Sequence, residues 1–95
     1  MLKALVVDAK DNVATALNDL NKGDSVAVEI EGTAVDIQLE QPLPFGHKFA
    51  LKKIKAGQAV IKYGEVIGLA TAGIAVGEHV HVHNVEGLRG RGDRQ

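Results

Sequence analysis

The sequence predicts a single, mainly β domain of short strands joined by tight glycine turns, with one short helix near the N-terminus. The chain has 95 residues, enough for one hydrophobic core but not for two. Its 11 glycines include several that stand between apolar stretches, as turns between short strands require. Hydrophobic residues make up 45% of the chain but aromatic residues only 3%, so Val, Ile, Leu and Ala must fill the core.

A short motif recurs four times at uneven spacing. In each copy an aliphatic residue stands three places before a glycine, and another apolar residue stands three places after it. The aliphatic residues are Leu20, Leu43, Ile54 and Ile74, the glycines are Gly23, Gly46, Gly57 and Gly77, and the later apolar residues are Val26, Phe49, Val60 and Val80. An extended approach, a glycine turn and a strand would produce this pattern. We therefore expect the glycines at turns and the later apolar residues in the core.

One segment has the pattern of a helix. Asp11 is a candidate N-cap, Gly23 follows the expected end, and apolar residues recur at helical spacing at Val13, Ala16, Leu17 and Leu20. Strands are expected at 2–7, 25–30, 33–39, 48–51, 59–62, 66–70 and 79–85, with Glu31 and Gly32 forming a hairpin turn. The domain is expected to span residues 1–86, and the polar, glycine-rich residues 87–95 predict a flexible tail.

Composition argues against several classes of protein. The chain has 11 basic and 12 acidic residues and a net charge of −1, without the basic patch that binding to nucleic acid or a membrane surface requires. It has no cysteine, which excludes a zinc–thiolate site and is typical of a cytoplasmic protein. The first residues become polar too early for a signal peptide, and no apolar run is long enough for a membrane span.

Three of the four histidines alternate along the stretch VGEHVHVHN. In a strand, His79, His81 and His83 would share one face, while Val80 and Val82 would point into the core. His81 and His83 would then lie roughly 6 to 7 Å apart, close enough to chelate one divalent metal ion. His47 could converge on the same place. From the residues alone, solvated or hydrogen-bonded histidines on an exposed strand face are the favoured interpretation, and the metal site is the alternative that stays open.

Two further polar positions have a functional and a structural interpretation. His47 and Lys48 follow Gly46 and would suit a carboxylate substrate, or they are solvated neighbours of a turn glycine. Asn84 would hold an imidazole or a substrate hydroxyl, or it caps the turn that ends the strand. No Ser–His–acid order, phosphate-binding loop or paired-carboxylate motif is visible.

Three stretches together resemble the SAF domain of the altronate and galactarate dehydratase family: DNVATALNDLNKGDSV, FGHKFALKKIKAGQAVIKYGEVIGLAT and GIAVGEHVHVHN. The resemblance covers roughly residues 6–84 and implies a β-clip fold, a compact arrangement of short strands with a short helix. In long members the domain is the N-terminal part of a sugar-acid dehydratase. In split members, including the similar sulfolactate sulfo-lyases, it is a small subunit beside a large one. Because the chain begins with methionine and ends soon after the domain, it is expected to be of the split kind.

The resemblance implies the loss of water from an aldonate or aldarate, or the loss of sulfite from a sulfonated hydroxy acid. Such a hydro-lyase needs a base for the proton next to the carboxylate and a Lewis acid, expected to be Fe²⁺, that helps hydroxide to leave. The chain lacks a cluster of glutamates or cysteines for this chemistry. The main catalytic groups are therefore expected on a larger subunit, and the chain alone is expected to be inactive. Self-association is left open.

The residues expected to face the substrate are His47, Lys48, His81, His83 and Asn84, with His81 and His83 as candidate metal ligands. Family members often carry an aromatic residue at position 79, so His79 is interpreted as a local addition. The resemblance also extends to SAF-like domains that occur in sialic-acid synthases and in pilus and flagellar assembly proteins. A module that binds a saccharide or a protein without chemistry is therefore the alternative function.

Overall fold

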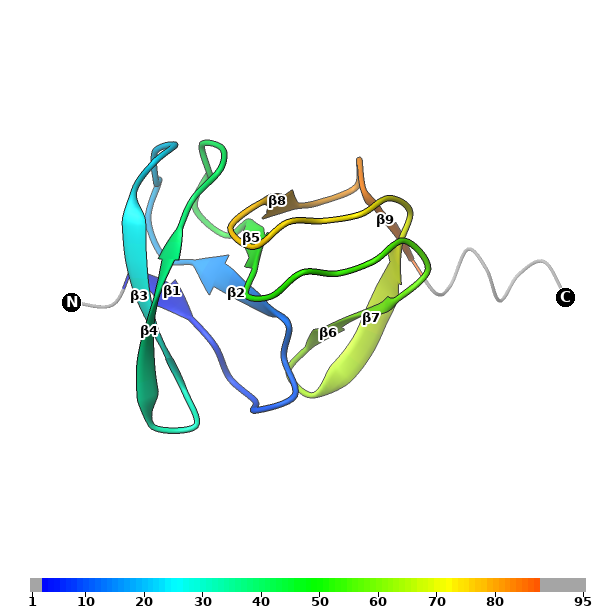
Figure 1. Ribbon diagram of the computed structural model, residues 1–95, viewed down its shortest axis with the longest axis horizontal. Coiled ribbons are helices and arrows are strands. Elements are labelled where there is room, and N and C mark those ends of the chain that lie inside the picture. The colour runs from blue at the N-terminus through cyan, green and yellow to red at the C-terminus, as the bar shows by residue number, and fades with distance from the viewer. Residues whose placement is uncertain (1–2, 88–95) are drawn as a thin grey trace, which may run out of the picture.

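The computed structural model describes residues 3–87, which form nine short antiparallel strands and no helix (Figure 1). The strands are β1 (Ala4–Leu5), β2 (Val13–Ala16), β3 (Ser25–Ile30), β4 (Thr33–Gln38), β5 (Lys48–Ala50), β6 (Ala59–Lys62), β7 (Glu65–Ala70), β8 (His79–Val80) and β9 (Val85–Gly87). One sheet has the order β1-β2-β5-β8, another has the order β6-β7-β9, and β3 pairs with β4. The prediction of a mainly β domain of short strands is confirmed. No segment within the described range is a helix of the length and hydrophobicity that a membrane span needs.

The helix predicted near the N-terminus is wrong. Its first half forms β2, which pairs with β1 on one side, placing Ala16 opposite Ala4, and with β5 on the other, placing Val13 opposite Ala50. An isolated helix of this length is marginally stable, whereas pairing on both sides satisfies the backbone and buries the apolar residues of β2. The apolar spacing that suggested a helix face instead reflects burial in a central strand and at Leu20.

The four-copy glycine motif is confirmed in every copy. Gly23, Gly46, Gly57 and Gly77 all have positive φ, between 83° and 88°. The apolar residues that follow them, Val26, Phe49, Val60 and Val80, are each 0% exposed. The aliphatic residues that precede them form two isolated antiparallel bridges, Leu20 with Leu43 and Ile54 with Ile74. The predicted turn at Glu31 and Gly32 also forms, and both residues have positive φ, as the hairpin turn requires.

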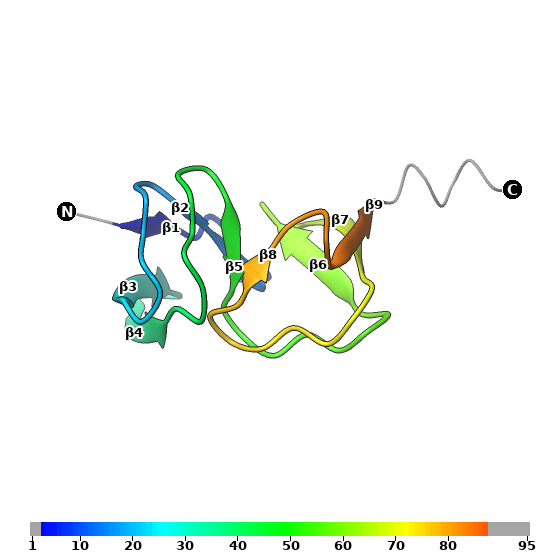
Figure 2. The same ribbon diagram turned by 90° about the horizontal axis from the view of Figure 1, so that it is seen from above.

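The two bridges organise the domain into two halves. Along the sequence, the β3–β4 hairpin falls between the two residues of the Leu20–Leu43 bridge. The β6–β7 hairpin falls in the same way between the two residues of the Ile54–Ile74 bridge. Figures 1 and 2 show the two hairpins at opposite sides, with β2, β5 and β8 between them. Each half has its own hydrophobic cluster, and β5 serves both, because Phe49 packs in the first and Ala50 in the second. The central strands therefore join the two cores.

The strand predicted over residues 79–85 is shorter than expected. β8 ends at Val80, residues 81–84 turn, and β9 begins at Val85. Val80 is buried as predicted, but Val82 is 82% exposed, so its predicted position in the core is wrong. Asn84 causes the change of direction, because its side chain bonds to the backbone of the preceding turn. The predicted tail lies outside the described residues apart from Gly87, which ends β9.

Candidate functional site

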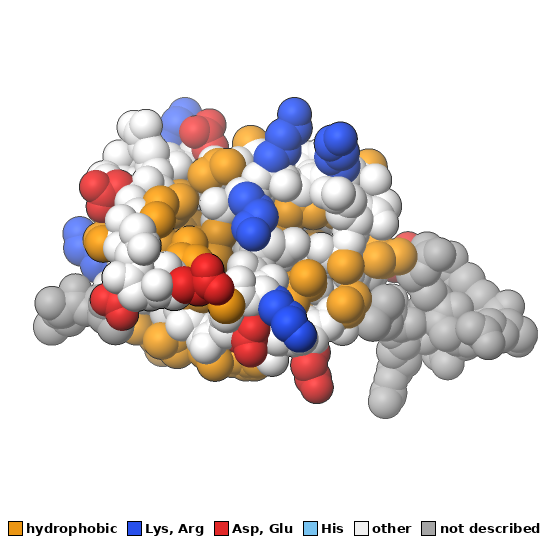
Figure 3. Space-filling view, turned by 60° about the horizontal axis from the view of Figure 1, so that its bottom comes forward, with side chains coloured by type: hydrophobic (Ala, Val, Ile, Leu, Met, Phe, Trp, Pro, Cys, Tyr) orange, Lys and Arg blue, Asp and Glu red, His pale blue; other side chains and the backbone are white. Residues whose placement is uncertain are grey.

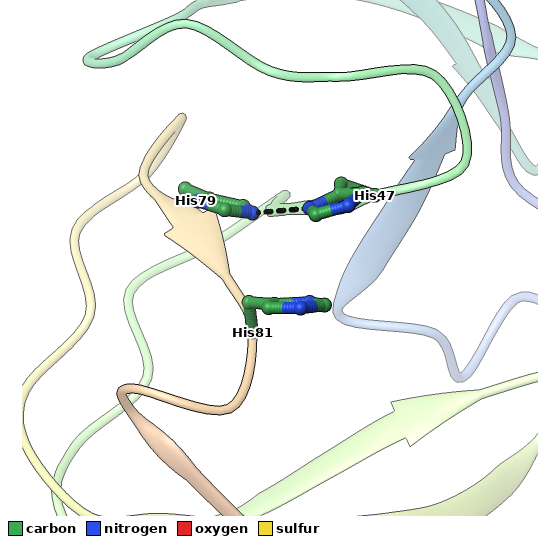
Figure 4. A group of neighbouring side chains, drawn as sticks. All are labelled: His47, His79 and His81. Carbon is green, nitrogen blue, oxygen red and sulfur yellow. Dashed lines mark hydrogen bonds between the residues drawn. The ribbon is translucent and has the colours of Figure 1, made fainter.

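Three histidine rings meet at the edge of the central sheet. The ring centroids of His47 and His81 are 4.3 Å apart, those of His47 and His79 are 5.0 Å apart, and those of His79 and His81 are 5.4 Å apart. Nδ1 of His47 lies 2.9 Å from Nε2 of His79, so one of these nitrogens donates a hydrogen bond to the other. Figure 4 shows His79 and His81 projecting from β8 and its end toward His47, which lies just before β5. We call these three residues the histidine cluster.

The pairing of β5 with β8 brings the cluster together. Lys48 lies opposite Val80 and Phe49 lies opposite His79. Continuing this antiparallel register by one position places His47 opposite His81. His79 and His81 are two residues apart and therefore lie on the same side of the chain. Phe49 and Val80 are fully buried, so the core fixes both strands and with them the position of the rings.

His47 is available for this contact because its turn does not need its side chain. In the other three copies of the glycine motif, the side chain of the residue after the glycine accepts a hydrogen bond from a backbone N–H. The donor is the first residue of the turn, two places before the glycine. These pairs are Asp24 with Asn21, Gln58 with Lys55, and Glu78 with Ala75. In the His47 copy the first turn residue is Pro44, which has no N–H. The imidazole of His47 is thus free to face His79.

Two amide side chains hold the backbone that carries His79 and His81. Oδ1 of Asn84 accepts the N–H of His81 at 2.9 Å, and Nδ2 of Asn84 donates to the carbonyl of His79 at 2.9 Å. Oε1 of Gln41 accepts the N–H of His79 at 2.8 Å. Asn84 is buried, and both the oxygen and the nitrogen of its side-chain amide form hydrogen bonds with the backbone. The cluster is therefore positioned by hydrogen bonds as well as by packing.

Positive charge and burial both favour the neutral rings. Burial lowers the pKa of His79, and the neighbouring His47, His83, His81 and Lys48 lower it further. Burial also lowers the pKa of His81, again with contributions from His47, Lys48 and His83. The pKa of Lys48 is lowered by burial and then by Lys62. The lowered pKa values favour the uncharged form of His79 and His81, whose imidazole nitrogens can then accept hydrogen bonds or bind a metal ion.

The structure brings together some of the residues predicted for the site. His47, Lys48 and His81 lie at the cluster, and Asn84 lies beneath it with its amide turned to the backbone. His83 is exposed, and although its ring contacts that of His79, its nitrogens are not among the three that converge. Sequence reasoning set His79 aside because of the resemblance. The alternation of His79 and His81 was the signal that should have kept it in the site.

The donor set of the cluster fits a divalent metal ion. One nitrogen from each of the three rings lies within 4.8 Å of the other two. Imidazole nitrogen suits first-row divalent ions, including Fe²⁺ and Zn²⁺. The rings come from separate segments that the core and the amides of Asn84 and Gln41 hold in place. A metal ion is therefore a ligand that this arrangement can accept without rebuilding the fold.

A hollow of about 240 Å³ adjoins the cluster. It is lined by Lys48, Ile67, His81, Val82, Val85 and Gly87. Its lining combines one cationic side chain and one imidazole with apolar groups, as a site for a small organic anion would. A different face of the molecule, seen in Figure 3, carries lysine and acidic side chains scattered among apolar ones, and no histidine comes into view there.

The comparison with known families and proteins agrees with the resemblance. The model of the altronate/galactarate dehydratase SAF domain matches residues 2–88. Altronate dehydratase of Escherichia coli (strain K12) is 47% identical over 83 residues, and that of Bacillus subtilis (strain 168) is 37% identical over 86 residues. These alignments cover 87% and 90% of this chain, but only 16% of each dehydratase.

A subunit of a second enzyme is also similar. The (2R)-sulfolactate sulfo-lyase subunit alpha of Paracoccus pantotrophus is 53% identical over 47 residues. That alignment covers 50% of this chain and 70% of the subunit. Both groups of relatives are lyases by name. The match over residues 2–88 shows that this chain belongs to the altronate/galactarate dehydratase SAF domain family.

Proposed function

We propose that this chain is the small subunit of a sugar-acid dehydratase, where it forms one wall of the substrate cleft while a larger subunit carries the main catalytic groups. The observation that carries the proposal is the histidine cluster beside Lys48, at the edge of a domain from this family. The domain accounts for 16% of the altronate dehydratases that it resembles, so most of such an enzyme lies outside this domain. The cytoplasm is the expected compartment.

The proposed reaction is the β-elimination of water from an aldonate or aldarate. A positively charged Lys48 attracts the substrate carboxylate, and the imidazoles of His47 and His81 form hydrogen bonds with its hydroxyl groups. A bound Fe²⁺ would act as the Lewis acid that helps hydroxide to leave. We assign the base that removes the proton next to the carboxylate to the larger subunit, because the imidazoles of the cluster are used here to hold the substrate and the ion.

The remaining predicted site residues take supporting roles in this proposal. His83 is exposed and lies at the rim, where it can meet the distal end of a long substrate. Asn84 acts through the backbone, since its amide holds His79 and His81 in place. Removal of Asn84 would therefore disturb both rings at once.

The surroundings of the cluster support coverage by a partner. Val82 and Phe45 are largely exposed, and Ile67 is partly exposed beside the hollow. Apolar side chains at the edge of a polar site are typical of a surface that another polypeptide covers. Such coverage would exclude water from the cleft and strengthen the contacts to the substrate carboxylate.

A second candidate function is the small subunit of a sulfolactate sulfo-lyase-like enzyme. It is favoured by the relative from Paracoccus pantotrophus, 70% of whose length aligns with this chain. The same residues would then bind the carboxylate of a sulfonated hydroxy acid, and the leaving group would be sulfite instead of hydroxide. A saccharide- or protein-binding module without chemistry is the alternative outside the enzymes.

One experiment separates these functions. The chain is purified alone and together with a large dehydratase-type subunit from the same organism, and each sample is supplied with Fe²⁺ under anaerobic conditions. Altronate, galactarate and sulfolactate are then tested for the formation of the keto acid or the release of sulfite. We expect turnover only in the two-subunit sample. Turnover above about 1 per second by the chain alone would overturn the division of labour. An inactive complex would favour the binding module.

A further inference from the structure

We propose that His47, His79 and His81 together bind one divalent first-row transition-metal ion, and that His83 is not a ligand. The site differs from the pair His81 and His83 that the sequence suggests. It includes His79, and it joins two segments that are 32 residues apart between His47 and His79. The metal site does not depend on the identity of the substrate or on the presence of a partner subunit.

The distances between the nitrogen atoms fit a shared ion. Ligand nitrogens about 2.1 Å from a metal ion are about 3.0 to 3.4 Å apart when they are neighbours in its coordination sphere. The 2.9 Å contact between Nδ1 of His47 and Nε2 of His79 is close to this range. All three ligand atoms lie within 4.8 Å of one another. The ring of His81 is stacked on those of His47 and His79, so it must rotate about its side-chain bonds to turn a nitrogen toward a shared ion. An ion would replace the hydrogen bond between the two rings.

The protein prepares the three rings before any ion arrives. His47 is released from its turn by Pro44, as described above, and His79 and His81 are fixed through Gln41 and Asn84. These hydrogen bonds fix the backbone from which the two rings project, which limits the rearrangement that binding of an ion requires.

The ligand set determines the kind of ion and the remaining chemistry. Three neutral imidazoles without a thiolate suit Fe²⁺, Co²⁺, Ni²⁺ or Zn²⁺ better than the oxygen-seeking Ca²⁺ or Mg²⁺. Three protein ligands leave at least one coordination position for water or a substrate oxygen. Lys48, which contributes to the lowered pKa of both His79 and His81, repels a cation and favours an anionic fourth ligand. A carboxylate or hydroxy acid is the natural ligand of that position.

His83 provides the control that separates this site from a general attraction of metal ions to histidine. Its ring is as near to that of His79, at 5.3 Å, as the ring of His81 is, at 5.4 Å. His83 is exposed, however, and it is not part of the group whose ligand atoms converge. The pair suggested by the sequence and the site proposed here therefore make opposite predictions for two residues. In the site proposed here His79 is essential and His83 is dispensable for metal binding. In the pair suggested by the sequence, His83 is essential and His79 is dispensable.

The test uses the full 95-residue chain without an affinity tag of histidines. Co²⁺ is titrated at pH 7.5 while its visible absorption is recorded, and Zn²⁺ is titrated by calorimetry. We expect one ion per chain. The variants His47→Gln, His79→Gln and His81→Gln should each weaken binding at least tenfold, and His83→Gln should change it less than threefold. Circular dichroism and thermal unfolding of each variant establish that it is folded.

Two results would overturn the proposal. One is the absence of saturable binding of Co²⁺ and Zn²⁺ to the folded chain. The other is a His83→Gln variant that loses as much affinity as His81→Gln while His79→Gln keeps the affinity of the native chain. Neither result bears on the proposed lyase function, which is measured by turnover in the two-subunit sample. Conversely, one Co²⁺ held by His47, His79 and His81 would stand even if no tested acid were a substrate.

Discussion

At the scale of single residues, the histidine cluster makes the stability of the domain depend on pH. The pKa values of His79 and His81 are lowered from their ordinary value of 6.5, mainly by burial. The folded state therefore binds fewer protons than the unfolded chain. The stability associated with these rings is fully present above pH 6.5 and is lost as the pH falls below it toward the folded-state pKa values. The titratable groups that face His79 and lower its pKa, besides His81, are His47, His83 and Lys48.

We expect the urea midpoint of unfolding to fall between pH 7.5 and pH 5.5. In the double variant His79→Gln/His81→Gln the same fall should be smaller, because Gln does not titrate. Chemical unfolding followed by circular dichroism at four pH values measures both slopes. A midpoint that stays constant in the native chain, or an equal slope in the variant, would show that the rings are protonated to the same extent in both states.

Asp11 is a second residue whose role differs from the one expected. It is 3% exposed, and its carboxylate accepts hydrogen bonds from the N–H groups of Val7, Asp8 and Gly64. Burial alone would raise its pKa, but these backbone hydrogen bonds outweigh burial and hold the pKa below its ordinary value. The residue predicted to cap a helix thus ties the loop before β2 to the β6–β7 turn.

We expect Asp11→Ala to lower the free energy of unfolding by about 1 to 3 kcal/mol at pH 7, because three backbone N–H groups lose their acceptor. Asp36→Ala is the control. Asp36 is exposed on β4, and its change should stay within roughly 0.5 kcal/mol. The contribution of Asp11 is present above the unfolded pKa of 3.8 and is lost as the pH falls through the folded value. Equal effects of the two variants at pH 7 would contradict the bracing role of Asp11.

At the scale of elements, the four glycine turns set the positions of the strands. A Cβ atom at Gly57 would meet no atom within 4 Å, but the φ of +88° is one that other residues rarely adopt. At Gly77 the φ is +83°, and a Cβ would also lie 2.0 Å from the carbonyl oxygen of Gln38. Gly73 has neither a positive φ nor a neighbour within 4 Å. Substitutions at these three positions therefore separate the cost of backbone strain from the cost of a steric clash.

We expect the cost in stability to increase in the order Gly73→Ala, Gly57→Ala, Gly77→Ala. Gly73→Ala should be nearly neutral, Gly57→Ala should cost about 1 kcal/mol, and Gly77→Ala should cost more because the backbone must shift. Thermal unfolding of the three variants measures the order. If Gly57→Ala were as stable as Gly73→Ala, the glycine motif would not mark turns that need a positive φ.

The sequence was a good guide where a local rule determines the structure. Glycine at a positive φ and the buried residue three places later follow from backbone geometry and hydrophobicity alone, so all four copies of the motif were predictable. β2 was not predictable in this way, because its apolar spacing fits a helix equally well and only pairing with β1 and β5 decides. The turn at residues 81–84 depends on the side chain of Asn84, which no periodicity reveals.

The site was predictable in part for the same reason. The alternation of histidines placed His79 and His81 on one side, and His47 was named as a residue that could join them. The register of β5 against β8, which places His47 opposite His81, is a long-range feature. His83 left the group because β8 ends at Val80, two residues before the alternation does. The resemblance set His79 aside because it concerns the residues typical of the family, whereas the contacts of this chain place the ring of His79 beside those of His47 and His81.

At the scale of the whole molecule, the domain carries its site between its two halves and at its surface. β5 belongs to both hydrophobic clusters, and His47 and Lys48 lie at its start. A partner that covers the cluster would therefore contact the stable centre of the domain. Val82, which is 82% exposed and lines the hollow beside His81, is the apolar residue best placed for that contact.

We expect Val82→Glu to weaken the association with a large dehydratase-type subunit at least tenfold, because a buried carboxylate without a partner is costly at an interface. Its folding should be unaffected, since the native side chain is already solvent-exposed. Val7→Glu is the matched control, because Val7 is also an exposed valine but does not line the hollow. Calorimetry of both variants against the large subunit measures the difference. Equal affinities would place the interface elsewhere on the domain, and equal losses would show that added negative charge alone weakens the complex.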